Sequence, residues 1–275
     1  MHNILINTCQ CRSRTSSVEF GVRLAARIGA AVTGTYVYPS LLQAIPRFST
    51  PDLVSTVLAN AEAIAAEARQ SGDGFVSWAH SAGVANAAWH VAEDYLPEAM
   101  ADIALWHDLF VLGHDPEFPW GSASDIASLI FATALPAIMV PAGPVETVQL
   151  DTLVFAWNGS AEATRALRAA LPLLKQSRRV VVLEGEQRRA ARAVAWKPPL
   201  DLDAYLSRHG IAFESRAFSA DSDEAGARLL AECASLSADM LIMGMYGRGR
   251  FSEWIVGGAT RHVLQHAALP VLLCH

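Results

Sequence analysis

The sequence has few charged residues and few cysteines, and it lacks the signatures of several enzyme classes. Charged residues make up 17% of the 275 residues and the net charge is −6. This argues against nucleic acid as a main partner, because phosphate backbones are bound by clustered Lys and Arg. None of the four cysteines forms C-x2-C, so neither a zinc site nor a disulfide framework is predicted. There is no G-x-S-x-G nucleophile elbow and no Walker P-loop.

No targeting or membrane segment is predicted either. The start, MHNILINTCQC, has no basic region followed by a long apolar segment, so a signal peptide is not expected. Residues 126–145 are uncharged, but Pro136, Pro141, Gly143 and Pro144 interrupt them, so a helix followed by a strand fits better than a membrane span. With 52% hydrophobic residues, the chain is expected to be a packed, reduced, cytoplasmic protein without a membrane partner.

What is present is an alternation of short apolar runs with amphipathic stretches, which predicts parallel βαβ units. Ser16 and Glu19 form a capping-box pattern at the start of the first helix. The first half is expected to contain strands at 2–7, 31–38, 75–80, 109–113 and 137–140, with helices near 16–28, 52–68, 85–104 and 124–133. In the second half, strands are expected at 152–156, 180–183, 212–218, 240–243 and 271–274, and helices after Ser160, at 200–209, at 222–236 and after Gly258.

The two halves share sequence landmarks. Ala101-Asp102 is matched with Ala238-Asp239, Leu112-Gly113 with Met243-Gly244, and Ala134-Leu135-Pro136 with Ala268-Leu269-Pro270. We therefore predict two tandem copies of one α/β domain, at residues 1–142 and 150–275, joined by a Pro- and Gly-containing linker.

The stretch from residue 238 to residue 275 carries the strongest pattern. A buried strand is followed by Gly244, Gly247, Gly257 and Gly258, then by a helix that Pro270 stops and by a last strand. Glycines let the backbone approach a ligand closely. The start of the helix offers unpaired N–H groups to an anion.

This stretch resembles the C-terminal half of a universal stress protein domain, whose nucleotide-binding branch shows G-x2-G-x9-G-[ST]. Gly244, Gly247 and Gly257 have that spacing, and Gly258 replaces the final Ser or Thr. The resemblance covers both halves, more weakly in residues 1–142. It implies an adenine nucleotide α-hydrolase-like fold: two doubly wound parallel five-stranded sheets of order 3-2-1-4-5. The domains would pair as a pseudo-twofold intrachain dimer through their last strands, with a homodimer of chains left open.

The resemblance also implies a nucleotide site in the second half. Asn158 replaces the acidic residue that holds adenine or ribose, which should weaken binding because a charged acceptor makes the stronger hydrogen bond. Trp157 would either stack on adenine or block it, and Tyr246 stands where many relatives have His. The implied contacts are Ala156, Trp157, Asn158, Leu183, Met243, Gly244, Tyr246, Gly247, Gly257, Gly258, Ala259 and Thr260. The ligand would be ATP, ADP or AMP, with Mg²⁺ held partly by the phosphates.

The first half departs from the pattern. Asn7-Thr8 replaces the acidic position, Asp115 and Glu117 would repel phosphate, and Gly121-Ser122 comes too early. This half is expected to have lost nucleotide binding and to serve as the pairing partner of the second.

Three functions remain open. The first is a stress-response regulator that binds an adenine nucleotide and is at most a slow ATPase, because no general base is evident. The second is a protein-interaction scaffold that binds no nucleotide and has an unidentified protein partner. The third, an enzyme of the α-hydrolase group, ranks last because Trp157-Asn158-Gly159-Ser160 does not supply an S-G-G-x-D-S loop.

Two smaller features carry weaker hypotheses. Cys9 and Cys11 could be redox-sensitive, although reactivity requires a lowered pKa. His262 and His266 have the i, i+4 spacing of metal ligands. No Glu follows His262 and no third ligand is evident, so no metal site is predicted.

Overall fold

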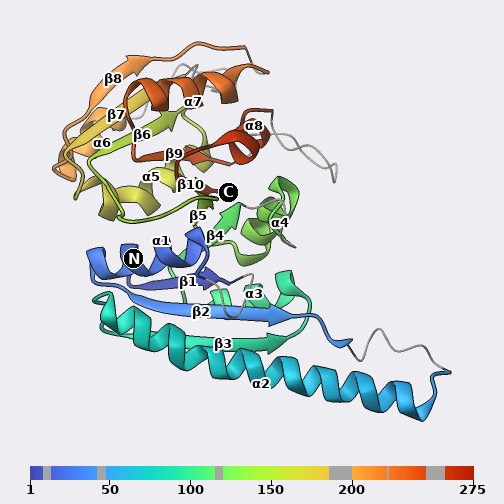
Figure 1. Cartoon of the computed structure of the whole chain (residues 1–275). Helices are drawn as coiled ribbons and strands as arrows, with labels where there is room; N and C mark the ends of the chain where they lie inside the picture. The colour runs from blue at the N-terminus through green and yellow to red at the C-terminus, as the bar shows by residue number, and fades with distance from the viewer. Residues whose placement is uncertain (9–13, 42–47, 115–119, 186–199, 222, 246–257) are drawn as a thin grey trace. The chain divides into compact units, whose positions relative to one another are not determined.

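The computed structural model describes residues 1–8, 14–41, 48–114, 120–185, 200–221, 223–245 and 258–275 (Figure 1). The chain divides into two compact units. Unit 1 comprises Met1–Leu135 and Ala142–Val148, and unit 2 comprises Pro136–Pro141 and Gln149–His275. In the described part of the chain, no helix is both long enough and apolar enough to cross a membrane.

Unit 1 is a parallel sheet of order β3-β2-β1-β4. Its strands are fully buried where β1 and β4 meet, because Ile4, Leu5 and Ile6 pair with the apolar run Leu109–Val111. In chain order its elements are β1 (Asn3–Asn7), α1 (Ser16–Ile28), β2 (Ala31–Tyr38), α2 (Pro51–Ser81), β3 (Ala87–Glu93), α3 (Leu96–Ala104), β4 (Leu109–His114) and α4 (Ala123–Thr133).

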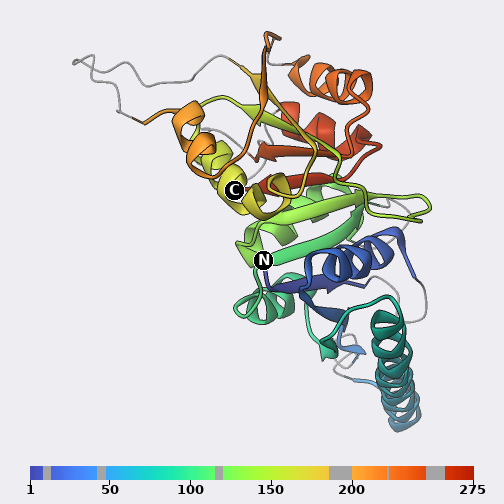
Figure 2. The ribbon, with the colours of Figure 1, turned by 90° about the vertical axis from the view of Figure 1, so that its left-hand side faces the viewer.

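Helices cover both faces of the unit 1 sheet (Figures 1 and 2). A Cβ on Gly21 of α1 would lie 2.5 Å from Ile6, and one on Gly34 of β2 would lie 2.8 Å from Phe75 of α2, so α1 and α2 share one face. On the other face, the His107 ring that follows α3 lies 2.9 Å from the Thr33 hydroxyl. Glycines at these contacts, Gly21 on α1 and Gly34 on β2, therefore set how closely the two helices pack on the sheet.

The strand predicted at 75–80 is wrong, and the helix predicted at 85–104 is confirmed only for α3 (Leu96–Ala104), because Ala87–Glu93 form β3. Residues 75–80 belong to the 31-residue helix α2, and β3 begins at Ala87. The reason lies in tertiary contacts. The Trp89 ring lies where a Cβ of Gly72 would be, and its Nε1 donates to the Ala68 carbonyl at 2.8 Å. A continuous helical face is buried by this packing, and it comprises Ala65, Ala68, Gly72, Phe75 and Ala79.

The capping box predicted at Ser16 and Glu19 is also wrong. The residue before α1 is Thr15, whose side chain makes no capping hydrogen bond, and Ser16 already lies in the helix. The Ser16 hydroxyl instead donates to the Gly143 carbonyl at 2.7 Å and accepts from the Gly143 N–H at 3.0 Å. The predicted end of α1 is confirmed, because Gly29 has a left-handed backbone with φ 69°.

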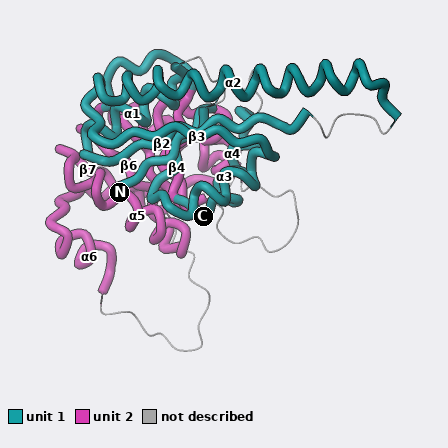
Figure 3. Tube along the Cα trace, turned by 90° about the horizontal axis from the view of Figure 1, so that it is seen from below, with its two compact units in different colours: residues 1–135, 142–148 teal, residues 136–141, 149–275 magenta. Residues whose placement is uncertain are grey.

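Unit 2, drawn in magenta in Figure 3, is a six-stranded sheet of order β5-β10-β9-β6-β7-β8. Its last five strands have the predicted order 3-2-1-4-5 and are parallel. The elements are β5 (Ala137–Pro141), β6 (Thr152–Trp157), α5 (Ala161–Leu174), β7 (Arg179–Glu184), α6 (Leu202–Arg208), β8 (Glu214–Ala217), α7 (Ala225–Ser235), β9 (Met240–Gly244), α8 (Gly258–His266) and β10 (Val271–Cys274).

The edge-to-edge pairing predicted for the last strands of the two halves is confirmed. β5 lies antiparallel to β10, with Val271 opposite Met139 and Leu273 opposite Ala137. All the paired residues are buried. The last strand of the first half is thus an integral part of unit 2, and it satisfies the backbone groups of β10 that an open edge would leave unpaired.

The sequence repeat is visible in equivalent structural roles, although one predicted landmark is misplaced. The counterpart of Asp239 is Asp108 rather than Asp102. Asp108 accepts from the N–H groups of His2 and Asn3, and Asp239 accepts from those of Asp151 and Thr152. In each half, a carboxylate just before the fourth strand therefore binds the backbone at the start of the first strand.

Candidate functional site

Three of the predicted site residues form one row across unit 2. Ala156 of β6 is the register partner of Leu183 on β7 and of Met243 on β9. Register partners in a parallel sheet project from the same face. Leu183 and Met243 are buried and Ala156 is half-buried. The row lies at the carboxyl end of the central strands, where open α/β sheets bind ligands, and it supplies an apolar floor.

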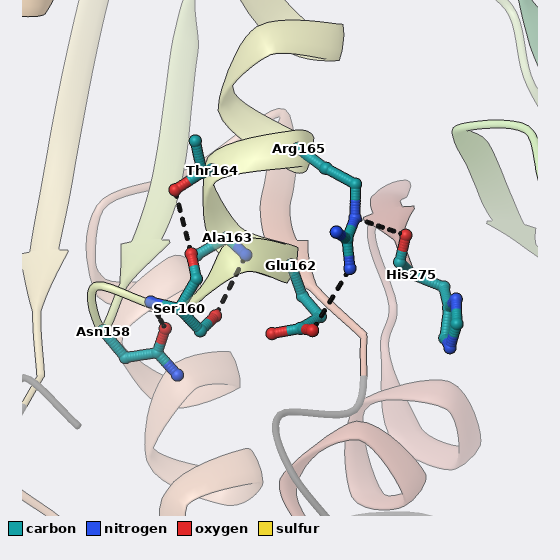
Figure 4. A network of polar contacts seen from close by, with 7 residues as sticks. All are labelled: Asn158, Ser160, Glu162, Ala163, Thr164, Arg165 and His275. Carbon is teal, nitrogen blue, oxygen red and sulfur yellow. Dashed lines mark hydrogen bonds and ion pairs between the residues drawn. The ribbon is translucent and has the colours of Figure 1, made fainter. Parts of the chain in front are cut away.

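The turn after β6 is built by its own polar side chains (Figure 4). Asn158 Oδ1 accepts from the Ser160 N–H at 3.1 Å, and Gly159 takes the left-handed backbone with φ 71° that the turn requires. Ser160 then caps α5 by accepting from the Ala163 N–H at 3.1 Å. The predicted turn and helix cap are confirmed. The Asn158 amide NH2 group is not used by this turn.

Gly244 holds the end of β9 against the start of α5. A Cβ at Gly244 would lie 2.5 Å from the Ala163 nitrogen and 2.7 Å from the Glu162 carbonyl carbon. Only glycine fits, because the close atoms belong to the backbone. The turn after β6 and the end of β9 are therefore brought together, as the strand order predicts. This role of Gly244 is close packing between elements, whatever else the residue contacts.

Trp157 projects to the opposite face from the Ala156 row, because neighbouring strand residues alternate. Its ring lies beside that of Phe155, with the ring centroids 5.7 Å apart and the planes tilted by 44°. The register partner of Trp157 is Glu184 at the end of β7. Glu184 is a half-buried carboxylate that sequence reasoning missed, and it accepts from the Ser215 hydroxyl. The sequence signal that could have identified Glu184 is the presence of an acidic residue at the end of the second strand of this half.

The first turn of α5 carries an ion pair whose cation also contacts the last residue of the sequence (Figure 4). Arg165 donates through an Nη atom to Glu162 at 3.1 Å and through Nε to the His275 carbonyl at 2.6 Å. Burial and the nearby Arg165 charge lower the pKa of His275. The exposed fraction of the Glu162 side chain is 18%. Arg165 therefore offsets a carboxylate that would otherwise repel an anion at this end of the sheet.

The predicted phosphate-binding helix start is described from Gly258 onward. Gly258 is exposed, Ala259 is half-buried, and Thr260 is 4% exposed, so its hydroxyl is covered. A Cβ at Gly226 of α7 would lie 2.8 Å from the Ala259 carbonyl oxygen, which shows that the start of α8 packs tightly on α7. Tyr246, Gly247 and Gly257 lie outside the described residues, as do Cys9, Cys11 and Trp254.

In unit 1 the polar groups at the equivalent place have structural partners. Both the N–H and the hydroxyl of Thr8 donate to the Thr35 carbonyl, at 2.9 and 2.7 Å. Ser122 caps α4 in a capping box with Asp125. A Cβ at Gly113 would lie 3.1 Å from the Ser17 hydroxyl, as Gly244 approaches α5 in unit 2. These contacts leave Thr8 and Ser122 committed to the fold.

The described residues contain no group of three or more His, Cys, Asp or Glu side chains that could hold a metal ion. Cys233 and Cys274 are free thiols, and burial raises the pKa of each to about 12. Thiols with raised pKa values are poor nucleophiles, so neither is a catalytic candidate.

Comparison with known proteins finds a family match in the second half of the chain and a shared fold over its whole length. Residues 150–275 match the model of the Universal stress protein family. A universal stress protein from Archaeoglobus fulgidus DSM 4304 aligns with 99% of this chain and 95% of its own, at 15% identity and a TM-score of 0.63. A functionally unknown protein from Pseudomonas aeruginosa PAO1 aligns with 100% and 92%, at 13% identity and a TM-score of 0.58. These likenesses show that the whole chain shares their fold. A comparison with curated protein sequences finds no match.

Proposed function

Since residues 150–275 of this chain belong to the universal stress protein family, we propose that this half binds an adenine nucleotide and acts as a stress-response regulator. The observation that carries the proposal is the row of Ala156, Leu183 and Met243 at the carboxyl edge of the sheet. An apolar floor beside a few polar groups is what a purine ring requires. The nearby Asn158 amide supplies a donor and an acceptor, which can read the edge of adenine or a ribose hydroxyl.

ATP is the proposed ligand, with ADP and AMP as shorter alternatives. The exposed Gly258 at the start of α8 supports the placement of the phosphates there, because helix N-termini attract anions. The residues predicted to complete the contact are Tyr246, Gly247 and Gly257. Mg²⁺ would be held largely by the phosphates themselves. No residue is assigned as a general base, so any hydrolysis is expected to be slow. The cytoplasmic location expected from the sequence stays a prediction.

The test is calorimetric titration of ATP, ADP and AMP into the full chain, after removal of any nucleotide carried through purification. Gly257→Glu places a carboxylate at the predicted phosphate position and is expected to abolish binding while the far-UV circular dichroism spectrum is unchanged. The matched control is Gly74→Glu, a change in α2 with no atom within 4 Å of the added Cβ. Absence of binding to the wild type at millimolar nucleotide would refute the proposal.

A gain-of-affinity variant tests the site more sharply. Asn158→Asp restores the acidic residue of the family pattern and can keep the hydrogen bond from the Ser160 N–H. A charged acceptor is worth about 1.5–3 kcal/mol, compared with about 1 kcal/mol for a neutral one. We therefore expect ATP to bind roughly 2- to 30-fold more tightly to Asn158→Asp. An unchanged or lower affinity would place the nucleotide away from this turn.

The second candidate function is a protein-interaction scaffold. It is favoured by Leu105 and Trp106, consecutive residues between α3 and β4 whose exposed fractions are 74% and 80%. Large apolar side chains exposed together are typical of interaction surfaces. If no nucleotide binds, this surface becomes the place to search for a partner, and Trp106→Ser should weaken any association that depends on it.

A further inference from the structure

Two histidines on the last helix form a pair that the proposed nucleotide site does not use. His262 and His266 lie on α8 with their ring centroids 4.2 Å apart and their planes inclined by 21°. His262 is held against α7, because its Cβ lies 2.6 Å from where a Cβ of Gly226 would be. His266 is exposed. One ring is thus anchored by packing, and the other is open to solvent beside it.

The hydrogen bonding of His266 fixes which ring nitrogen can bind a ligand. Its Nδ1 lies 2.9 Å from the His262 carbonyl oxygen. A carbonyl oxygen only accepts, so Nδ1 must carry the proton. In the neutral ring the lone pair then resides on Nε2. This arrangement, with Nδ1–H donated to a backbone carbonyl and Nε2 left for coordination, is typical of metal-binding histidines.

The electrostatics of the helix end favour a cation at the same place. α8 ends at His266, and the unpaired carbonyls of a helix C-terminus carry the negative end of the macrodipole. The χ2 torsion of histidine is broad, so small rotations can turn both Nε2 atoms toward one ion. No third His, Cys, Asp or Glu joins the pair among the described residues. Water can fill the remaining coordination positions.

We propose that His262 and His266 form a two-histidine site for a borderline divalent transition ion such as Ni²⁺, Cu²⁺ or Zn²⁺. Imidazole suits these ions, whereas Mg²⁺ and Ca²⁺ require oxygen ligands. Both ligands lie on one helix, so the ion binds the folded helix and raises its stability by mass action. The two histidines lie at the middle and the C-terminal end of α8, whereas the predicted phosphate contacts lie at its start, and the metal site does not depend on the proposed nucleotide binding.

The experiment titrates Ni²⁺ into the full chain without an affinity tag at pH 8, where free imidazole is neutral. Cys9→Ser and Cys11→Ser are present in every sample, because thiolates also bind such ions. One Ni²⁺ per chain is expected by calorimetry, with a rise in Tm. His262→Asn and His266→Asn should each weaken binding at least about tenfold, since even outer-shell changes at metal sites cost 10- to 100-fold. The matched control is His209→Asn, which removes a histidine from unit 2 outside the pair.

A further readout separates this site from general metal binding. Mg²⁺ should leave the Tm unchanged. The proposal is overturned if the wild type binds no stoichiometric Ni²⁺, or if binding persists in the His262→Asn/His266→Asn double variant. It is also overturned if His209→Asn removes binding equally, or if Mg²⁺ raises the Tm as much as Ni²⁺.

Discussion

The glycine that begins the predicted phosphate loop already has a demanding structural task. Gly244 allows β9 to contact the first turn of α5 at distances that no Cβ could occupy. Its counterpart Gly113 approaches Ser17 of α1 less tightly, at 3.1 Å. The family resemblance implies that Gly244 contacts the ligand, and the structure shows that it packs against α5. The two roles are compatible. Because it has no side chain, Gly244 also adds no bulk to the carboxyl edge of the sheet.

Replacing Gly244 tests the packing role. Gly244→Ala is expected to destabilise the chain by about 1–3 kcal/mol, because an added methyl group forces the backbone at Ala163 to shift. Gly74→Ala is the matched control. Gly74 lies in α2 with nothing within 4 Å of an added Cβ, so alanine there should stabilise by about 0.5–1 kcal/mol. Urea unfolding of the three proteins measures both effects. Equal stabilities of the two variants would contradict the assigned role.

At the scale of elements, each half fixes the start of its first strand with a carboxylate from the residue before its fourth strand. In unit 1, the backbone N–H groups of His2 and Asn3 hold the pKa of Asp108 below its ordinary range, although partial exposure to solvent weakens the effect. These bonds join residues far apart in the sequence. They therefore act on the pairing of strands rather than on the formation of any one strand.

The lowered pKa gives a pH dependence with a definite sign. Asp108 contributes stability above its unfolded pKa of about 4, and this contribution is lost as pH falls through the lower folded pKa. Wild type should therefore lose stability on acidification below pH 5 more steeply than Asp108→Asn. Asp73→Asn, an exposed change in α2, is the control and should behave as wild type. Chemical unfolding at a series of pH values measures the slopes. Parallel curves for wild type and Asp108→Asn would exclude the assigned role.

Sequence patterns predicted the elements of unit 2 better than those of unit 1. Buried apolar runs such as Met240–Gly244 are short and end at glycine, so they read as strands. Residues 75–80 contain Phe75 and Trp78 and have strand character locally, but they continue α2. The deciding contact is the Trp89 ring over Gly72, and no window of local sequence contains that information. The error at β3 follows from the error at α2.

At the scale of the whole molecule, the strand β5 belongs by its contacts to unit 2 although it ends the first half of the sequence. Its antiparallel pairing with β10 covers an edge that would otherwise present a row of unpaired N–H and C=O groups. A chain cut at the sequence repeat, before residue 149, would lose that cover. A chain cut before Pro136 would keep it.

Two fragments test this arrangement. Residues 149–275 lack β5, and we expect them to associate through β10, since a second copy can pair antiparallel in the place of β5. Residues 136–275 retain β5, so they should show no association through β10 at the same concentration. Light scattering coupled to size-exclusion chromatography distinguishes the two. A monomeric 149–275 fragment with native circular dichroism would show that the β10 edge needs no cover.

The candidate site was predictable in part. The sequence placed Ala156, Leu183 and Met243 in the same site through the family resemblance, and the register of β6, β7 and β9 puts them in one row. It did not find Glu184, whose relevance depends on the pairing of Trp157 with β7. It expected Thr260 to contact the ligand, and the structure buries this residue.

The sequence by itself determined the α/β class, the tandem repeat and the turn from Asn158 to Ser160. These depend on periodicity, caps and glycines that act within a few residues. The strand order of unit 2 was implied by the family resemblance. The tertiary structure alone decided the extent of α2, the partner of Asp108 and the stacking of His262 on His266. The physical reason is that local preferences are weak. Contacts between distant segments, or the packing of a side chain in the folded chain, override them.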